Sequence, residues 1–137
     1  MTDFMSTIAT DNYRLARSKT LVNPADATYN LIVIPKFAFI DQIWLYITTA
    51  YAGGGSDATG TIGFLGNGET ADPDGFMDIA ACAVTATGIK RMTDDGQPGS
   101  KGKWFNSASG QLTITLAVEN CTTVMTGFVF MRYSVLH

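Results

Sequence analysis

Four carboxylates that lie close together in the sequence are the residues best placed to do chemistry. They are Glu69, Asp72, Asp74 and Asp78. Asp72, Asp74 and Gly75 match part of a calcium-binding loop, in which carboxylate oxygens surround one cation. The third acidic position and the closing bidentate glutamate of that motif are missing, and aspartate before glycine is also ordinary turn chemistry. Asp72, Asp74 and Asp78 are therefore a weak calcium candidate. Solvated turn carboxylates are the favoured interpretation, and we expect no metal and no cofactor.

Other catalytic arrangements fit the chain poorly. Paired carboxylates can hydrolyse a glycosidic bond, but they need a groove with aromatic walls that the sequence does not place. His137 is the only histidine, so a Ser–His or Cys–His site would rest on the end of this chain. No lysine follows the glycines at 53–55, which favours a flexible loop over a phosphate cradle. We expect no enzyme; a hydrolase that uses the aspartates is the catalytic alternative.

Aromatic residues offer a different chemistry, the binding of sugars. Trp44 and Trp104, with Tyr46, Tyr51 and Phe105, have ring types that can stack on a glycan. Core and interface anchors are the commoner use of such rings. Because Trp44 lies in the middle of the longest apolar run, we favour anchors over a sugar-binding platform.

The elements that position these residues are predicted to be strands. Apolar, β-branched and aromatic runs are separated by Gly, Asn, Asp and Pro, and residues 66–75 are predicted to be a long turn. This pattern indicates roughly seven to nine strands in an all-β fold, an antiparallel β-sandwich or jelly roll. The strand candidates are residues 29–34, 37–49, 61–65, 88–92, 104–105, 111–118 and 126–137.

Two of these strands are apolar on both faces, whereas a surface strand of a lone sandwich should be apolar on one face only. Residues 126–137 carry Val129 on one face and Phe128 on the other. In residues 37–49 one face is predicted to carry Ile43, Leu45 and Ile47, and the other Ile40, Trp44 and Tyr46. One face can serve the subunit's own core while the other meets another subunit. The predicted subunit-interface residues are Trp44, Tyr46, Phe128, Phe130 and Leu136.

The composition supports an assembled protein rather than a solitary one. A chain of 137 residues predicts a single domain. Hydrophobic residues make up 46% and charged residues 15%, against about 25% charged in typical domains. The net charge of −3 argues against direct binding of nucleic acid through a basic face.

Cys82 and Cys121 show no metal-binding spacing; reduced, buried thiols are the favoured interpretation, and a disulfide between them is left open. The first residues show no signal peptide, and no apolar run reaches the ~18 residues of a membrane helix. We therefore expect synthesis in a cytoplasm and no membrane partner.

Residues 1–24 are predicted to be an N-terminal arm, and residues 25–137 the β-sandwich domain. The arm is polar and weakly patterned, and it ends at the turn signal Asn23-Pro24. A frayed terminus and a tether that orders on a partner are both open, because Leu15, Leu21 and Val22 could add a strand to a sheet edge.

Residues 24–49 (PADATYNLIVIPKFAFIDQIWLYITT) and 58–78 (ATGTIGFLGNGETADPDGFMD) carry a recognisable order of segments. With the closing aromatic strand, they resemble the small all-β capsid decoration, or cement, proteins of tailed bacteriophages. The likeness covers most of residues 24–135. It implies a jelly-roll subunit, commonly a homotrimer, on the outer surface of a phage head, where it clamps the major capsid protein.

The family likeness does not fix the contacts of the arm. Arg14, Arg17 and Lys19 are hypothesised to pair with an acidic coat surface. The alternative function is a head-fibre, tail-fibre or spike module that binds host-surface glycans.

Overall fold

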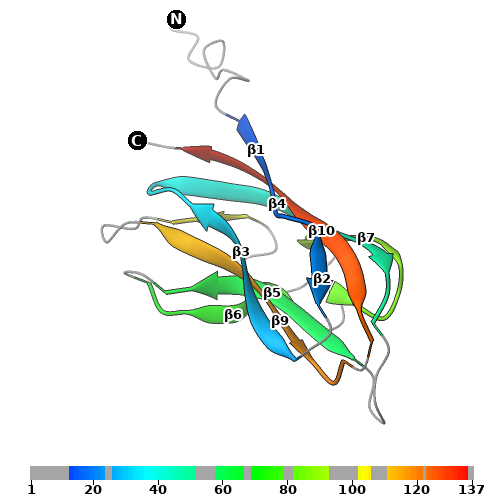
Figure 1. Cartoon of the computed structure of the whole chain (residues 1–137). Coiled ribbons are helices and arrows are strands. Elements are labelled where there is room, and N and C mark those ends of the chain that lie inside the picture. Colours follow the sequence, from blue (N-terminus) through cyan, green and yellow to red (C-terminus); the bar gives the residue numbers. More distant parts are fainter. Residues whose placement is uncertain are drawn as a thin grey trace, which may run out of the picture.

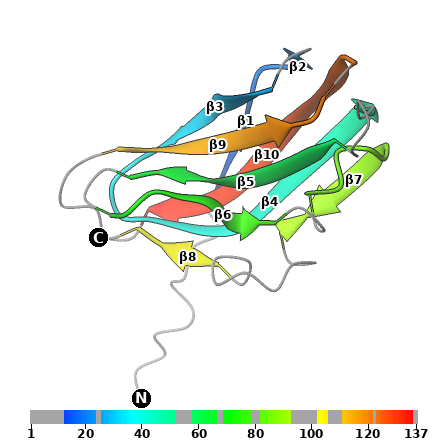
Figure 2. The same cartoon turned by 90° about the horizontal axis from the view of Figure 1, so that it is seen from below.

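The computed structural model describes residues 13–23, 26–51, 58–66, 69–78, 82–92, 102–105, 111–121 and 123–135. These residues form ten strands in two antiparallel sheets that pack face to face (Figures 1 and 2). The all-β sandwich predicted from the sequence is therefore confirmed. Within the described ranges, no helix has the length and apolar character needed to cross a membrane.

The larger sheet contains six strands in the order β1-β10-β4-β7, with β2 attached to β10 and β8 attached to β4. We refer to it as the six-stranded sheet. Its strands are β1 (Tyr13–Arg17), β2 (Leu21–Asn23), β4 (Ala38–Thr49), β7 (Gly88–Arg91), β8 (Lys103–Trp104) and β10 (Met125–Val135).

The four-stranded sheet has the order β3-β9-β5-β6. Its strands are β3 (Ala27–Ile34), β5 (Thr59–Leu65), β6 (Asp72–Met77) and β9 (Leu112–Glu119). Each sheet contains neighbouring strands from distant parts of the chain, since β1 pairs with β10 and β3 pairs with β9, whereas β5 and β6 are consecutive in the sequence. This is the strand order of a jelly roll, in which a long hairpin-like ribbon folds over itself into two facing sheets.

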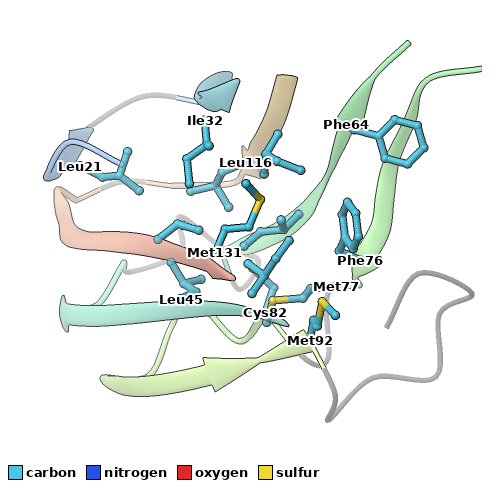
Figure 3. Close-up of a cluster of buried hydrophobic side chains, with 14 of the residues drawn as sticks. Leu21, Ile32, Leu45, Phe64, Phe76, Met77, Cys82, Met92, Leu116 and Met131 are labelled. Carbon is cyan, nitrogen blue, oxygen red and sulfur yellow. The ribbon is translucent and has the colours of Figure 1, made fainter. Parts of the chain in front are cut away.

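The core fills the space between the sheets with aliphatic, aromatic and methionine side chains. Figure 3 shows Leu45 and Met131 of the six-stranded sheet meeting Leu116 of the four-stranded sheet. On β9 the alternation predicted from the sequence is confirmed on the inner face, where the side chains are buried. These residues are Leu112, Ile114, Leu116 and Val118.

One end of the core is aromatic and is closed by a charged pair. The rings of Phe64, Phe76 and Phe105 contact one another with centroids 4.9 to 6.1 Å apart. Lys103 on β8 lies over this cluster, with Nζ 4.9 Å from the centroid of Phe105, and it pairs with Glu69 at 3.0 Å. The pair ties β8 of one sheet to the segment that leads into β6 of the other.

A β-bulge in β4 changes which side chains face the core. Against β10, Gln42 lies opposite Arg132 and Ile40 lies opposite Tyr133, so Asp41 is the extra residue. An extra residue reverses the inward and outward positions of the strand. Ile40 and Ile43 are therefore both buried. The predicted alternation is wrong at Ile40, which faces the core and not the outer surface with Trp44.

The described part of the predicted arm, residues 13–23, contributes β1 and β2 to the six-stranded sheet. Ser18 bridges the break between these strands: its N–H donates to the Val129 carbonyl at 2.8 Å, and the Val129 N–H donates to Ser18 Oγ at 2.9 Å. The strand addition that the sequence allows for Leu15, Leu21 and Val22 therefore describes residues 13–23. The division of the chain at residue 24 stays a prediction.

Candidate interaction surface

The outer surface of the six-stranded sheet carries a group of apolar side chains that we call the aromatic face. They come from three strands, β4, β7 and β10, and line a shallow depression of about 270 Å³. The sheet alternation explains the direction of the β4 and β10 side chains, because each lies one position from a residue that faces the core, and Ile89 lies opposite Tyr46 in the β4–β7 register. The aromatic face consists of Trp44, Tyr46, Ile89, Phe128 and Phe130.

Cross-strand pairing brings the rings together. Trp44 lies opposite Phe130 and Tyr46 lies opposite Phe128 in the β4–β10 register. The ring centroids of Tyr46 and Phe128 are 5.2 Å apart, and those of Phe128 and Phe130 are 5.1 Å apart at an angle of 86°. Edge-to-face and tilted contacts of this kind are favourable geometries for aromatic pairs. The depression is therefore preformed by ring contacts within the subunit.

A close backbone approach holds β4 and β10 together at one end of this face. A Cβ atom on Gly127 would collide with the Tyr46 carbonyl oxygen, so only glycine fits there. Beside it, the hydroxyls of Thr48 and Thr126 lie 2.7 Å apart. The position of Phe128, one residue after Gly127, depends on this approach.

Arg17 lies on the aromatic face. Its guanidinium carbon is 4.1 Å from the ring centroid of Phe128 and 5.9 Å from that of Phe130. β1 pairs with β10 so that Arg17 stands opposite Phe130. A guanidinium stacked on aromatic rings gains a cation–π interaction and keeps its N–H groups available to an acceptor.

An ion pair borders the same face at the β4 bulge. Arg132 Nε donates to both carboxylate oxygens of Asp41 at 3.0 Å, and Arg132 Nη2 lies 2.9 Å from Asp41 Oδ2. The hydrogen bond to Asp41 raises the pKa of Arg132 above its usual value. The Arg132 guanidinium also lies 5.6 Å from the ring of Tyr13 and 5.7 Å from that of Trp44. It therefore links β1, β4 and β10.

Exposed apolar side chains occur in the depression and also beyond it, on the edge strand β1. Leu15 on β1 is 73% exposed, Ile89 on β7 is 60% exposed and Phe130 is 37% exposed. A contiguous group of exposed hydrophobic side chains marks an interaction surface, whereas a single exposed hydrophobic residue is common on any protein.

The structure brings four of the five predicted interface residues onto this one surface: Trp44, Tyr46, Phe128 and Phe130. Leu136 lies outside the described residues. Sequence reasoning missed Ile89 and Arg17 as members of the surface. Ile89 stands in a strand of four residues, which is too short for a clear alternation. Arg17 falls in the predicted arm, and its pairing partner is more than a hundred positions away.

The three predicted arm cations do not form one cluster. Arg17 lies on the aromatic face, whereas Arg14, three residues earlier, points to the other side of β1 and is exposed. Lys19 is exposed and lines a separate depression of about 230 Å³ between β2 and β3, together with Ser18, Leu21, Asn30 and Leu31.

The predicted acidic group is divided by the fold. Asp72 and Asp74 lie on β6, and their side chains share a hydrogen bond. That hydrogen bond, together with burial and the charge of Asp72, raises the pKa of Asp74. Glu69 is instead paired with Lys103. Over the described ranges, no three acidic, cysteine or histidine side chains gather as metal ligands would.

The remaining candidate residues occupy unrelated positions. Tyr51 and Phe105 are buried, so neither contributes to a surface platform for sugars, while Trp104 on β8 is 49% exposed. Cys82 is buried and Cys121 is partly buried, and no disulfide joins them. His137 lies outside the described residues.

The fold and this surface together define a jelly-roll β-sandwich with an exposed aromatic sheet face. Similar solved structures come from bacteriophage capsids. A chain of the cyanophage Pam1 capsid asymmetric unit superposes with a TM-score of 0.67 at 9% identity, covering 99% of this chain and 98% of that one.

A chain of the acidic stable capsid structure of Helicobacter pylori bacteriophage KHP30 superposes with a TM-score of 0.64 at 16% identity, covering 90% of this chain and 87% of that one. No protein-family model and no curated protein matches the sequence. At these identities the likeness is one of fold.

Proposed function

We propose that this chain is a structural protein of a bacteriophage virion, a decoration or cement protein on the outer surface of the head. The observation that carries the proposal is the agreement of fold, over nearly the whole of both chains, with a chain of a phage capsid. The sequence resemblance to decoration proteins points the same way. Its partners would be other copies of this chain and the major capsid protein, with no direct contact to nucleic acid or membrane and no catalytic role.

The aromatic face supports assembly into a homotrimer. Its side chains lie on the side of the sheet away from the core, where a solitary sandwich would carry polar residues. Burial against another copy would remove apolar area from water at about 25 cal/mol per Å². Aromatic residues are also the usual energetic centre of a subunit interface. The trimer is therefore proposed to use Trp44, Tyr46, Phe128 and Phe130.

Cementing works by mass action. A protein that binds the assembled shell, and not the free coat protein, stabilises the shell by its binding free energy. A trimer holds three coat contacts at once, so weak individual contacts combine into strong binding. Arg14 and Lys19 are exposed and can meet an acidic coat surface, whereas Arg17 is committed to the aromatic face.

The test is to compare phage particles with and without this protein. We expect many copies per head, located outside the shell by cryo-electron microscopy, and release of the genome at a lower temperature from heads that lack it. Heads that release their genome at the same temperature with and without the protein would contradict a cementing role.

A glycan-binding fibre or spike module is the second candidate. The half-exposed Trp104 and the apolar depression beside Trp44 favour it, because sugar rings stack on exposed aromatic rings. A glycan array and a count of copies per particle separate the two functions. Few copies with glycan binding favour the fibre module, and hundreds of copies without glycan binding favour cement.

A further inference from the structure

The aromatic face of the proposed trimer needs a covering surface, and symmetry restricts what that surface can be. Only a two-fold axis lets an extended surface patch meet its own copy. Around a three-fold axis, a patch that lies away from the axis must meet a different patch on the next subunit. In a trimer that uses the aromatic face for its subunit contacts, with this face away from the axis, the surface that covers it is therefore a different patch of the next copy.

The positive charge of Arg17 on the aromatic face favours a second patch that carries carboxylates. Arg17 is stacked on Phe128, and no described carboxylate pairs with it. On the four-stranded sheet, Asp72 and Asp74 are hydrogen-bonded to each other, and within the described ranges no cation pairs with either of them. Two adjacent carboxyls and a guanidinium without a carboxylate partner among the described residues are complementary, since arginine binds carboxylates through paired N–H donors.

The surroundings of the two aspartates are apolar as well as acidic. Leu65, at the end of β5, is 44% exposed, and Pro73 is exposed between Asp72 and Asp74. We call Leu65, Asp72, Pro73 and Asp74 the β6 edge. Like the aromatic face, it combines charge with apolar area, and its charge has the opposite sign.

The two patches lie on different sides of the subunit, as a ring requires. β6 is the edge strand of the four-stranded sheet, whereas Arg17 stands on β1 at the opposite edge of the six-stranded sheet. Figure 2 shows β8 near β6 at one edge of the sandwich, and β2 near β3 at the other. Because β1 and β2 both pair with β10, β1 belongs to the edge opposite to β6. The Lys103–Glu69 ion pair joins the two sheets at the edge of the sandwich that contains β6, and the depression between β2 and β3 lies at the opposite edge.

We propose that the aromatic face of one copy docks on the β6 edge of the next, with Arg17 bound to Asp72 and Asp74, and that three such contacts close a ring. The inference rests on the proposed trimer and specifies its geometry. In this contact Pro73 and Leu65 cover the rings of Phe128 and Phe130, while the guanidinium replaces the hydrogen bond that the two aspartates make to each other.

The test is a charge swap, read by sedimentation equilibrium of the purified full chain. We expect Arg17→Glu, and separately the double change Asp72→Lys with Asp74→Lys, to weaken trimer association by about tenfold or more. The combined triple variant restores opposite charges at every contact and should recover most of the wild-type association. Matched controls are Arg14→Glu, on the other side of β1, and Glu119→Lys, at the end of β9; both should remain trimeric.

The possible outcomes distinguish failure of the proposed trimer from failure of the proposed contact between its subunits. A wild-type chain that sediments as a monomer contradicts the trimer and this inference together. A wild-type trimer that is broken by Phe130→Asp but unaffected by the charge changes overturns the inference and leaves the trimer standing. Failure of the triple variant to recover association also overturns it, with circular dichroism confirming that the variant is folded. Should Arg17→Glu not fold, Arg17→Gln and the salt dependence of association provide the same test.

Discussion

At the scale of single residues, Ser18 shows how one hydroxyl maintains a sheet across an interruption. β1 and β2 are separate strands, and at the break the Ser18 hydroxyl accepts the Val129 N–H while itself donating to the Lys19 carbonyl. Ser18 is buried, so the Val129 N–H has no access to water there.

We predict that Ser18→Ala lowers the free energy of unfolding by about 1–3 kcal/mol, because it leaves a buried N–H without an acceptor. Urea denaturation followed by circular dichroism measures the change. Thr85→Ala, at an exposed turn position, is the control and should change the stability by less than about 0.5 kcal/mol. A loss no larger than that of the control would mean that Val129 finds another acceptor.

Asp74 predicts a pH dependence at the same scale. Its pKa is raised, mainly by the hydrogen bond to Asp72, so the folded state holds the proton more tightly than the unfolded state does. A group of this kind stabilises the fold below its unfolded pKa of about 3.8, and this stabilisation is lost as the pH rises through the raised, folded value.

Asp74→Asn keeps a neutral hydrogen-bonding side chain at every pH. In the Arg17→Glu background, where the proposed subunit contact is absent, we expect the variant to match its parent near pH 3. We expect it to unfold at a higher temperature than the parent at pH 7. Calorimetry at both pH values measures the difference, and a constant difference between pH 3 and pH 7 would exclude the pair as its source.

At the scale of elements, β6 is the strand that sequence reasoning missed. The sequence predicts a turn over residues 66–75 because Asp, Pro and Gly are turn residues, yet residues 72–77 form a strand. The reason is position: β6 is an edge strand, where proline does not remove a hydrogen bond from the sheet interior. Periodicity places β4 and β9 well, because both are long and central.

The β-bulges and the strand pairings could not be predicted from the sequence, because they depend on strands that lie far away in the chain. Nothing in the local pattern shows that Asp41 is the extra residue, because the bulge is defined against β10. The candidate site is therefore predicted only in part. The tryptophan and phenylalanine rings of β4 and β10 are visible in the sequence as a second apolar set, whereas Arg17 joins them only through the pairing of β1 with β10.

Gly63 predicts how β6 is held in place. A Cβ atom at this position would overlap the Asp72 carbonyl oxygen and the backbone of Pro73. Gly63→Ala should therefore separate β6 from β5, lower the stability by about 2 kcal/mol or more, and increase amide exchange in β6. Thr61→Ala, on the same strand without such an approach, should leave exchange in β6 unchanged. Unchanged protection in Gly63→Ala would show that the bulge between Ile62 and Phe64 can absorb the methyl group.

At the scale of the whole molecule, the two sheets differ in what their outer sides offer. Aromatic rings and arginines cover the six-stranded sheet, while β6 of the four-stranded sheet offers carboxylates and proline. A subunit with two unlike and complementary sides is suited to head-to-tail contacts around an axis. The low proportion of charged residues in the chain, 15%, agrees with surfaces that are covered on assembly.

The aromatic face gives the prediction at this scale. Phe130→Asp places a carboxylate among Trp44, Phe128 and Arg17, where burial against another copy would desolvate it. Phe128→Asp also removes the ring on which Arg17 is stacked. We expect both variants to be monomers or aggregates. Val33→Asp is the matched control, since Val33 is an exposed apolar residue on β3 of the other sheet, and it should remain trimeric. Sedimentation equilibrium measures the outcome: stable, well-folded trimers of both phenylalanine variants would show that the subunits associate through another surface.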